Sequence, residues 1–359
     1  MHFGVFNVMQ QRFASVAPDQ VVHEAVDQAR TAEQLGFDSC WFPEHHSSNY
    51  SLCPSPLLMV AHCAAATDRI RLGTGVIVAP LHKPIRVLAE IGITDILTDG
   101  RLDLGIGAGY QPFEFERFGV DLEANKQMTF ELLDMIEDGL TADSFSYAGK
   151  HYQQPPTSIP VRPTQQPLPP IWLVGSDSAF HERAATNGYA VFVSGLLGRP
   201  ESIVKLRGRV ETAFERAGKS ASALRLGLLR YAFVGRNRAE SRQYAENVLY
   251  QTRIAAALRN RREHVHDSYF VDELPFEGEP SVDELLDRLI IGDVETCIER
   301  ASREIRDAGV TDLVLQAKLG DLPHALAMQS LRLWMEEVVP GIERELGQPI
   351  SEINRVQVP

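Results

Sequence analysis

The chain has 359 residues, a formal net charge of −13 and a calculated pI of about 5.3. Phosphates would be repelled by so acidic a surface, so we expect neither nucleic acid nor a membrane as a partner. The start at Met1–Phe6 has the pattern of a strand rather than of a secretory signal, and no apolar run has the length of a membrane helix. The four cysteines show no CxxC or metal-ligand spacing, which favours reduced thiols in a cytoplasmic protein.

Strand and helix signals alternate nearly from end to end. Short apolar runs predict strands at residues 2–8, 39–42, 70–78, 101–106, 171–174, 190–194, within 224–234, and at 312–316. Helical spacing predicts helices between them, among others at 18–35, 56–67, 84–98, 121–140 and 293–308. Eight such units indicate an α/β fold, a (β/α)8 TIM barrel formed by residues 1–359 as one domain. A doubly wound open sheet is the alternative, because periodicity alone cannot close a sheet.

Two segments are longer than the strand–helix unit that repeats along the chain requires. Residues 245–290, between the seventh and eighth strands, contain the basic run Arg259–His264 and an acidic run up to Glu284. We expect this polar insertion to be a mobile lid. The tail from Leu322 to Leu346 is predicted to be an amphipathic helix, interrupted at Pro340, that packs outside the barrel.

An unusual polar triplet, Glu44-His45-His46, follows the apolar strand at 39–42. Because burying an unpaired charge is costly, these residues should face a cleft. The carboxyl ends of the strands carry the chemistry in a (β/α)8 barrel, so we expect an active site here. Adjacent residues of an extended chain point to opposite sides, which leaves one histidine for the barrel mouth. No further ligand spacing such as HExxH accompanies the triplet, so no metal is expected.

Three glycine-containing stretches admit two readings each. Gly105-x-Gly107-x-Gly109 does not fit a dinucleotide fingerprint, and is either a tight turn or a loop that admits a flat ring or a phosphate. Gly73 and Gly75 indicate a planar ring against the backbone or a bulge. The stretch 175–178 is either an ordinary helix cap or, with a lysine as countercharge, a phosphate site.

Taken together, several stretches resemble the bacterial luciferase family of flavin-dependent monooxygenases. They are Phe3–Phe6, Glu44–His46, Gly73–Val78 with Pro80, Asp99–Gly107, Phe118–Asp121, Pro169–Trp172 with Gly175, and Glu336–Pro340. Each is weak alone, but their order and spacing span almost the whole chain. The resemblance implies a TIM barrel that binds FMN at the carboxyl ends of its strands.

The resemblance also implies roles for individual residues. His45 matches the catalytic histidine, and Glu44 matches a carboxylate beside the isoalloxazine and the subunit interface. Gly75-Val76 falls where the family often has a non-prolyl cis peptide against the flavin. Further cofactor contacts are implied at Gly107, Ala108, Tyr110, Lys126, Gly175, Ser176, Asp177 and Ser178. Gly107 and Ala108 replace a reactive cysteine and a phosphate-binding arginine of luciferase, so light emission is not expected.

The implied reaction uses reduced FMN, delivered by a separate NAD(P)H:flavin reductase, and dioxygen. A flavin hydroperoxide would oxygenate a small organic substrate while the lid excludes water. We expect His45 to transfer protons, and Glu44 to orient it or to brace a homodimer formed through the helices at 56–67 and 84–98. Candidate substrate contacts are His46, Arg230, Tyr231, Gln316 and Lys318.

Two alternatives remain open at this point. One is hydride transfer with a deazaflavin coenzyme and no dioxygen. Relatives with that chemistry tend to have an Asp-His pair at this position, so the triplet Glu44-His45-His46 favours FMN. The other is a non-catalytic flavin-binding accessory protein, against which His45 and the long insertion argue.

Overall fold

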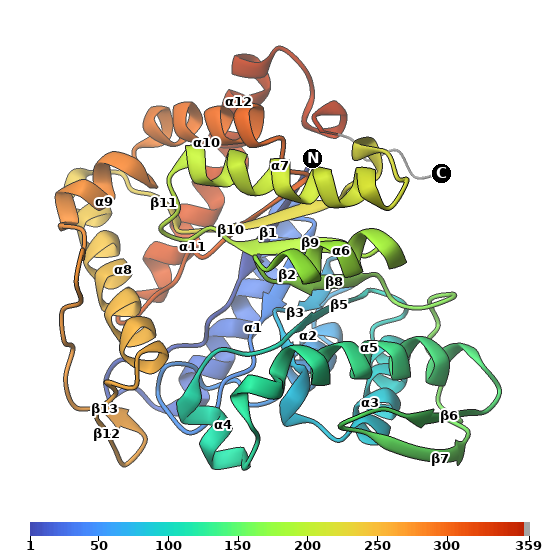
Figure 1. Ribbon diagram of the computed structural model, residues 1–359. Coiled ribbons are helices and arrows are strands. Elements are labelled where there is room, and N and C mark those ends of the chain that lie inside the picture. The colour runs from blue at the N-terminus through green and yellow to red at the C-terminus, as the bar shows by residue number, and fades with distance from the viewer. Residues whose placement is uncertain (355–359) are drawn as a thin grey trace.

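The computed structural model describes residues 1–354 and contains a closed parallel barrel (Figure 1). Its strands are β1 (His2–Phe6), β2 (Ser39–Phe42), β3 (Arg71–Thr74), β4 (Ile77–Val78), β5 (Leu102–Gly107), β8 (Ile171–Val174), β9 (Ala190–Ser194), β10 (Leu226–Arg230) and β15 (Asp312–Leu315). Strands β3 and β4 pair one after the other with β5, so that together they occupy one position of an eight-position barrel. The predicted (β/α)8 barrel is confirmed.

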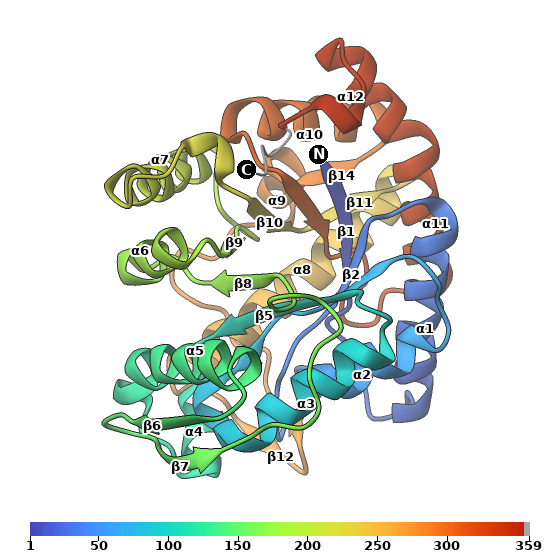
Figure 2. The same cartoon turned by 90° about the vertical axis from the view of Figure 1, so that its right-hand side faces the viewer.

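Helices surround the barrel on all sides. They are α1 (Pro18–Leu35), α2 (Pro56–Ala64), α3 (Pro84–Leu97), α5 (Asn125–Thr141), α6 (Ser178–Asn187), α7 (Pro200–Arg216), α10 (Val294–Ala308), α11 (His324–Leu333) and α12 (Val339–Leu346). In both views α7, α10 and α12 cover one side, and α3 and α5 cover the opposite side (Figures 1 and 2). Several helices begin at a proline, and α1 ends at Gly36 in the left-handed conformation, as the sequence predicts.

Large rings fill the barrel interior. Trp41 stacks on Phe192 with ring centroids 5.2 Å apart and meets Trp172 edge-on at 5.4 Å. A Cβ atom on Gly73 would lie 2.2 Å from the Trp41 ring, so this glycine makes room for the chain's own indole rather than for a ligand. Ser194, two residues beyond Phe192 and therefore on the same side of β9, is exposed. The barrel interior is thus filled by these rings and becomes open to solvent at the carboxyl ends of the strands.

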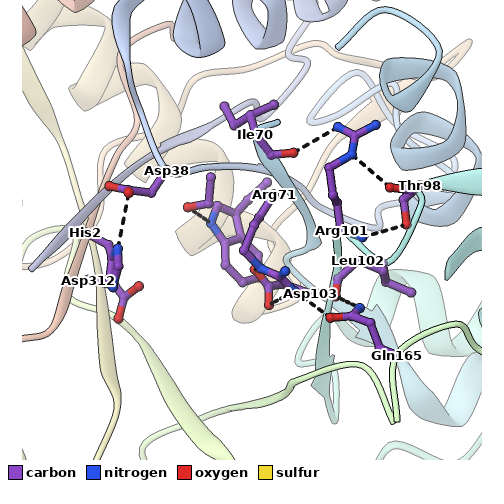
Figure 3. A network of polar contacts seen from close by, with 12 residues as sticks. His2, Asp38, Ile70, Arg71, Thr98, Arg101, Leu102, Asp103, Gln165 and Asp312 are labelled. Atoms are coloured by element: carbon purple, nitrogen blue, oxygen red, sulfur yellow. Dashed lines mark hydrogen bonds and ion pairs between the residues drawn. The ribbon is translucent and has the colours of Figure 1, made fainter. Parts of the chain in front are cut away.

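Ion pairs close the opposite end of the barrel (Figure 3). Arg71 binds Asp103 with two hydrogen bonds of 2.9 and 3.0 Å and also donates to Gln165. Arg101 donates to the carbonyl of Ile70 from the neighbouring strand. Because this end of a (β/α)8 barrel serves stability rather than chemistry, these contacts should matter for folding.

We therefore expect Asp103→Asn to lower the free energy of unfolding by about 2 kcal/mol, since it leaves a half-buried guanidinium without its carboxylate. The Asp103 side chain is almost fully buried, and that of Arg71 is 31% exposed. Urea unfolding provides the measurement. Glu90→Gln, which breaks the exposed pair Arg86–Glu90, is the matched control and should cost less than about 0.5 kcal/mol. Equal effects of the two changes would contradict this assignment.

The predicted lid segment, residues 245–290, contains several ordered elements. Helix α8 (Arg238–Arg259) extends through residues 245–259 and buries much of that stretch, and is followed by the hairpin β12 (Val265–His266) and β13 (Tyr269–Phe270) and by α9 (Val282–Arg288). Strand β14 (Ile290–Gly292) then pairs with β11 (Ala232–Val234). The polar runs at residues 259–264 and 272–284 follow α8, and a lid role for this segment stays a prediction.

Two further elements were not predicted, helix α4 (Pro112–Phe118) and the hairpin of β6 (Phe145–Ala148) and β7 (Gln153–Thr157). The tail is helical with a π-helical turn, Trp334–Val338, just before Pro340. All four cysteines are buried and free. Across residues 1–354, none of the helices combines the length and apolar character needed to cross a bilayer.

Candidate active site

The imidazole of His45 lies at the carboxyl end of β2, where the chain leaves the barrel. Its Nδ1 is 3.1 Å from Oε1 of Glu114, and this carboxylate also accepts the His46 backbone N–H at 2.8 Å. Glu114 is only 2% exposed. The amide Nε2 of Gln111 also approaches Nδ1, at 3.2 Å. Because an ionised carboxylate can only accept a hydrogen bond, the contact with Glu114 favours the tautomer with the proton on Nδ1, which leaves Nε2 as the acceptor. The pair therefore presents an oriented base.

Glu114 was not predicted as a site residue, because helix α4 was not predicted. Local signals for this short helix do exist. Pro112 occupies its first turn, Phe113 and Phe115 are buried, and Gly119 ends it in the left-handed conformation. These signals would have placed a carboxylate directly after the glycine-rich end of β5.

Glu44 does not contact His45 through a hydrogen bond, contrary to the expectation that it orients the imidazole. Its buried carboxylate accepts hydrogen bonds from Nε2 of His46 and of His82, each at 2.9 Å, and from the Val78 backbone N–H at 2.8 Å. Glu44 therefore fastens the segment after β4 to the end of β2. His46 is occupied by this contact and packs against Phe118 at 4.6 Å, which turns it away from the role of a free substrate contact.

The Glu44–His82 contact should make stability depend on pH. Burial disfavours both charges. For Glu44 it is outweighed by the hydrogen bonds from His46, His82 and the Val78 N–H, so its pKa lies below 4.5. For His82 it is outweighed by the contact with Glu44, so its pKa lies above 6.5. A raised histidine pKa contributes stability that is complete below 6.5 and is lost as the pH rises through the folded-state value. The lowered pKa of Glu44 contributes stability that is complete above pH 4.5 and is lost as the pH falls through the folded-state pKa.

We therefore expect the free energy of unfolding to fall as the pH rises above 6.5, and His82→Gln to flatten this slope because glutamine donates without titrating. Urea unfolding at several pH values measures how the free energy of unfolding changes with pH in the wild type and in His82→Gln. A slope that persists unchanged in His82→Gln would contradict the assignment.

The peptide bond Gly75-Val76 is cis, as the resemblance implied, and lies between β3 and β4 at the barrel mouth. Both residues are partly exposed. The glycines of β5 follow this segment closely: a Cβ on Gly105 would lie 1.9 Å from the Thr74 carbonyl oxygen, and one on Gly107 would lie 3.0 Å from Val76. Gly105 and Gly107 thus accommodate the neighbouring chain, and the partly exposed backbone of Gly75 and Val76 is what remains open to a ligand.

A phosphate-type donor set lies at the start of α6. Ser176 and Ser178 are exposed, and Lys126 on α5 reaches Asp177 at 2.7 Å. Asp177 also accepts the Ala179 backbone N–H, so it caps the helix, and its pKa is lowered by Lys126 and by that N–H. An ammonium and two hydroxyls fit a phosphate, provided that Lys126 leaves Asp177, whereas the Ala179 and Phe180 amides already donate to Asp177.

The structure corrects two of the predicted substrate contacts. Arg230 is fully buried, bound to Glu304 on α10 and to the carbonyls of Gly195 and Gly198, so it supports the loop after β9 from outside the barrel. Lys318 forms an ion pair with Glu24 on α1 at 2.9 Å. Both side chains project away from the mouth.

The two other predicted contacts, Tyr231 and Gln316, are each about 1% exposed at the ends of β10 and β15. The Gln316 carbonyl accepts the hydroxyl of Tyr244 from α8. Tyr231 packs in the same apolar cluster as Trp41, Trp172 and Phe192. These two residues thus lie beneath the mouth, and a substrate role for them stays a prediction.

Helix α8 covers the His45 side of the mouth. Its residues Tyr250, Ile254 and Leu258 form one apolar cluster with Tyr50 and Phe113. The Tyr50 ring in turn meets the His45 ring edge-on at 4.7 Å. The segment that the sequence marked as a lid therefore touches the immediate neighbours of the oriented histidine, which is consistent with shielding it from water.

Residues 1–312 match the luciferase-like monooxygenase family. A protein of Sinorhizobium fredii called y4vJ is 39% identical over 348 residues, which cover 97% of this chain and 99% of that protein. The oxygenase component of a flavin-dependent trigonelline monooxygenase from Acinetobacter baylyi is 33% identical over 267 residues, covering 73% of each chain.

Solved structures share the fold at lower identity. Monooxygenase RslO1 from Streptomyces bottropensis superposes with a TM-score of 0.83 at 21% identity, covering 95% of this chain and 99% of its own. The oxygenating constituent of 3,6-diketocamphane monooxygenase from Pseudomonas putida, in complex with FMN, gives 0.76 at 19%, covering 95% and 98%. An F420-dependent secondary alcohol dehydrogenase gives 0.72 at 16%, again covering 95% and 98%. From the closed barrel and the extent of the family match it follows that this chain belongs to the luciferase-like monooxygenases, as its motifs indicated.

Proposed function

We propose that this protein is the oxygenase component of a two-component monooxygenase that takes reduced FMN from a separate flavin reductase. The observation that carries the proposal is the oriented His45–Glu114 pair beside the partly exposed Gly75-Val76 backbone at the mouth of the barrel. The relative named as an oxygenase component of a flavin-dependent monooxygenase supports the two-component arrangement. The substrate is a small organic molecule.

The described residues fit FMN. Its ring would lie against Gly75 and Val76, near the turn that begins at Gly107 and Ala108, and its phosphate would take Lys126 from Asp177, beside Gly175 and the hydroxyls of Ser176 and Ser178. Reduced FMN supplies the electrons with which dioxygen is activated.

His45 would then handle the proton. With Nδ1 held by Glu114, the free Nε2 can accept a proton from a reacting group and return it, while the buried carboxylate stabilises the imidazolium that forms. Helix α8 and Tyr50 shield this position from bulk water, which limits unproductive loss of reducing equivalents.

The direct test is an anaerobic titration with reduced FMN, followed by mixing with oxygenated buffer and a substrate panel. The panel includes trigonelline, a long-chain alkanal and a cyclic ketone, because relatives or neighbours of this chain are named for such chemistry. We expect tight binding of reduced FMN and substrate-dependent oxygen uptake with one oxygen atom in the product. Hydride transfer from a reduced deazaflavin without oxygen uptake would contradict the proposal.

A homodimer through α2 and α3 is part of the proposal. These adjoining helices expose large apolar side chains, with Leu58 71% and Leu97 54% exposed, and Ile85, Ile93 and Ile96 beside them on α3. Several large apolar side chains exposed on two adjoining helices are typical of an association site. We expect a dimer in sedimentation velocity and a shift to monomer for Leu58→Glu. Val204→Glu, on the exposed side of α7, is the control and should leave the dimer intact. A wild-type monomer would contradict this part of the proposal.

A further inference from the structure

A chain of hydrogen bonds leads from the loop after β15 to the barrel mouth, and its direction is set as far as the Tyr50 hydroxyl. The backbone N–H of Gly320 donates to Oε1 of Gln10 at 2.7 Å, which leaves the Gln10 amide N–H free to donate. That group donates to Oε1 of Gln251 on α8, and Nε2 of Gln251 donates to the Tyr50 hydroxyl at 2.9 Å. A backbone N–H can only donate, so the first bond sets the orientation of both side-chain amides.

The chain of hydrogen bonds continues through two tyrosines. The Tyr50 oxygen accepts from Gln251, so its own proton is available for the Tyr110 hydroxyl, 3.3 Å away. The Tyr110 oxygen also receives a hydrogen bond from Nε2 of Gln111 at 3.2 Å. When Tyr50 is the donor to Tyr110, both acceptor positions of the Tyr110 oxygen are filled, and its own O–H is left to donate to another group. Within residues 1–354 the Tyr110 hydroxyl donates to no third group.

Charges of both signs lie near Tyr110, the buried carboxylate of Glu114 and the guanidinium of Arg259. The guanidinium carbon of Arg259 lies 5.0 Å from the centre of the Tyr110 ring, and Arg259 forms no ion pair within the described part of the chain. Burial of the hydroxyl end and the charge of Glu114 raise the pKa of Tyr110 by more than Tyr50, Gln111 and Arg259 lower it, so the hydroxyl keeps its proton. The ring centre is 6.4 Å from that of His45. A donor and a positive charge therefore stand beside the proposed catalytic histidine.

We propose that the Tyr110 hydroxyl, directed by this chain and assisted by Arg259, binds an anionic oxygen of the organic substrate, a phenolate or a carboxylate. The proposal rests on the proposed function for its reaction, and assigns the substrate class of that same site. The backbone of Tyr110 belongs to the turn that was predicted to contact the cofactor. Its hydroxyl lies elsewhere, next to Tyr50 and Gln111 on the His45 side. Tyr110 thus determines specificity rather than performing the reaction.

The test uses the full chain without cofactor, so that it does not depend on turnover. It compares 4-nitrophenol, at a pH where it is ionised, with 4-nitrotoluene, which has the same shape but no hydroxyl oxygen. Binding is followed by the nitrophenolate absorbance and by equilibrium dialysis. We expect the wild type to bind nitrophenolate at least about tenfold more tightly than nitrotoluene, and Tyr110→Phe to abolish this preference.

Three variants sharpen the test. Arg259→Met should weaken nitrophenolate binding and leave nitrotoluene binding unchanged, whereas Tyr50→Phe should reduce the preference only in part, because Gln111 still donates to Tyr110. Tyr147→Phe is the control, since it removes a hydroxyl that binds Asp134 far from the mouth, and should change neither affinity.

Each outcome decides for or against the proposal. No preference for nitrophenolate in the wild type, or a preference retained in Tyr110→Phe, would overturn it. A parallel titration with reduced FMN distinguishes the two proposals: loss of FMN affinity in Tyr110→Phe would assign the oxygen to the cofactor and overturn the substrate assignment. Failure of the wild type to bind reduced FMN would remove the proposed function while leaving the nitrophenolate result valid.

Discussion

Replacing His45 with alanine is expected to lower kcat for product formation by about a hundredfold or more when reduced FMN and dioxygen are supplied. The expectation follows from the geometry: His45 is the imidazole at the mouth whose Nδ1 is held by a buried carboxylate, leaving Nε2 free to accept a proton. General acid–base catalysis by such a group contributes about a hundredfold to ten-thousandfold. Product formation and oxygen uptake are measured together at saturating reduced FMN.

The control is His23→Ala, which removes an exposed imidazole on α1. It should leave kcat unchanged, and reduced FMN should bind His45→Ala nearly as well as wild type, because the imidazole is proposed to act on protons rather than to hold the cofactor. Unchanged turnover in His45→Ala would remove this residue from the mechanism.

Glu114→Gln is the second change for which we expect a large effect. Glutamine has the shape of glutamate, but it cannot stabilise an imidazolium by charge, and it presents either an oxygen or an amide to Nδ1 of His45 and to the His46 N–H. We expect kcat to fall by about tenfold to a hundredfold, with a change in the pH profile of kcat. Steady-state kinetics across pH measures both.

The same helix offers a matched control for this change. Glu116 lies two residues further along α4, is more than half exposed, and pairs with Arg261. Glu116→Gln should leave kcat and its pH profile unchanged. If both substitutions had the same effect, the loss would come from disturbance of α4 and not from the His45–Glu114 contact.

The barrel could be predicted because its strands are short, apolar and bounded by turn residues. The strands 39–42, 171–174 and 190–194 have the predicted bounds, and helix 18–35 begins and ends as its proline and glycine indicate. The third strand was predicted as one run over 70–78, whereas the cis peptide at Gly75-Val76 divides it into β3 and β4. Local patterns determine elements of this kind.

The partners of the site residues could not be read in the same way. Glu44 is adjacent to His45 in sequence, which suggested a pair, but residues next to each other on an extended chain face opposite ways, and Glu44 meets His46 and His82 instead. The actual partner, Glu114, comes from a seven-residue helix too short for a periodic signal.

Sequence alone also does not show which way a side chain on a barrel strand points, and this explains the wrong prediction for Arg230. Arg230 follows the inward-facing Leu229 on β10 and therefore faces outward, but the sequence does not state which alternate set points into the barrel. A helix at residues 245–259 was not predicted. This part of α8 packs one side against Tyr50 and Phe113. Tertiary contacts decide both cases.

The central claim is that reduced FMN lies at the barrel mouth against Gly75-Val76, with the His45 imidazole beside its ring. A crystal structure of the full chain with FMN, reduced in the crystal under anaerobic conditions, tests this most directly. We expect ring density against that cis peptide, phosphate density at Lys126 and Ser176, and His45 still bound to Glu114 with Nε2 directed at the ring. Ring density at any other place, or an imidazole turned away from the ring, would contradict the account.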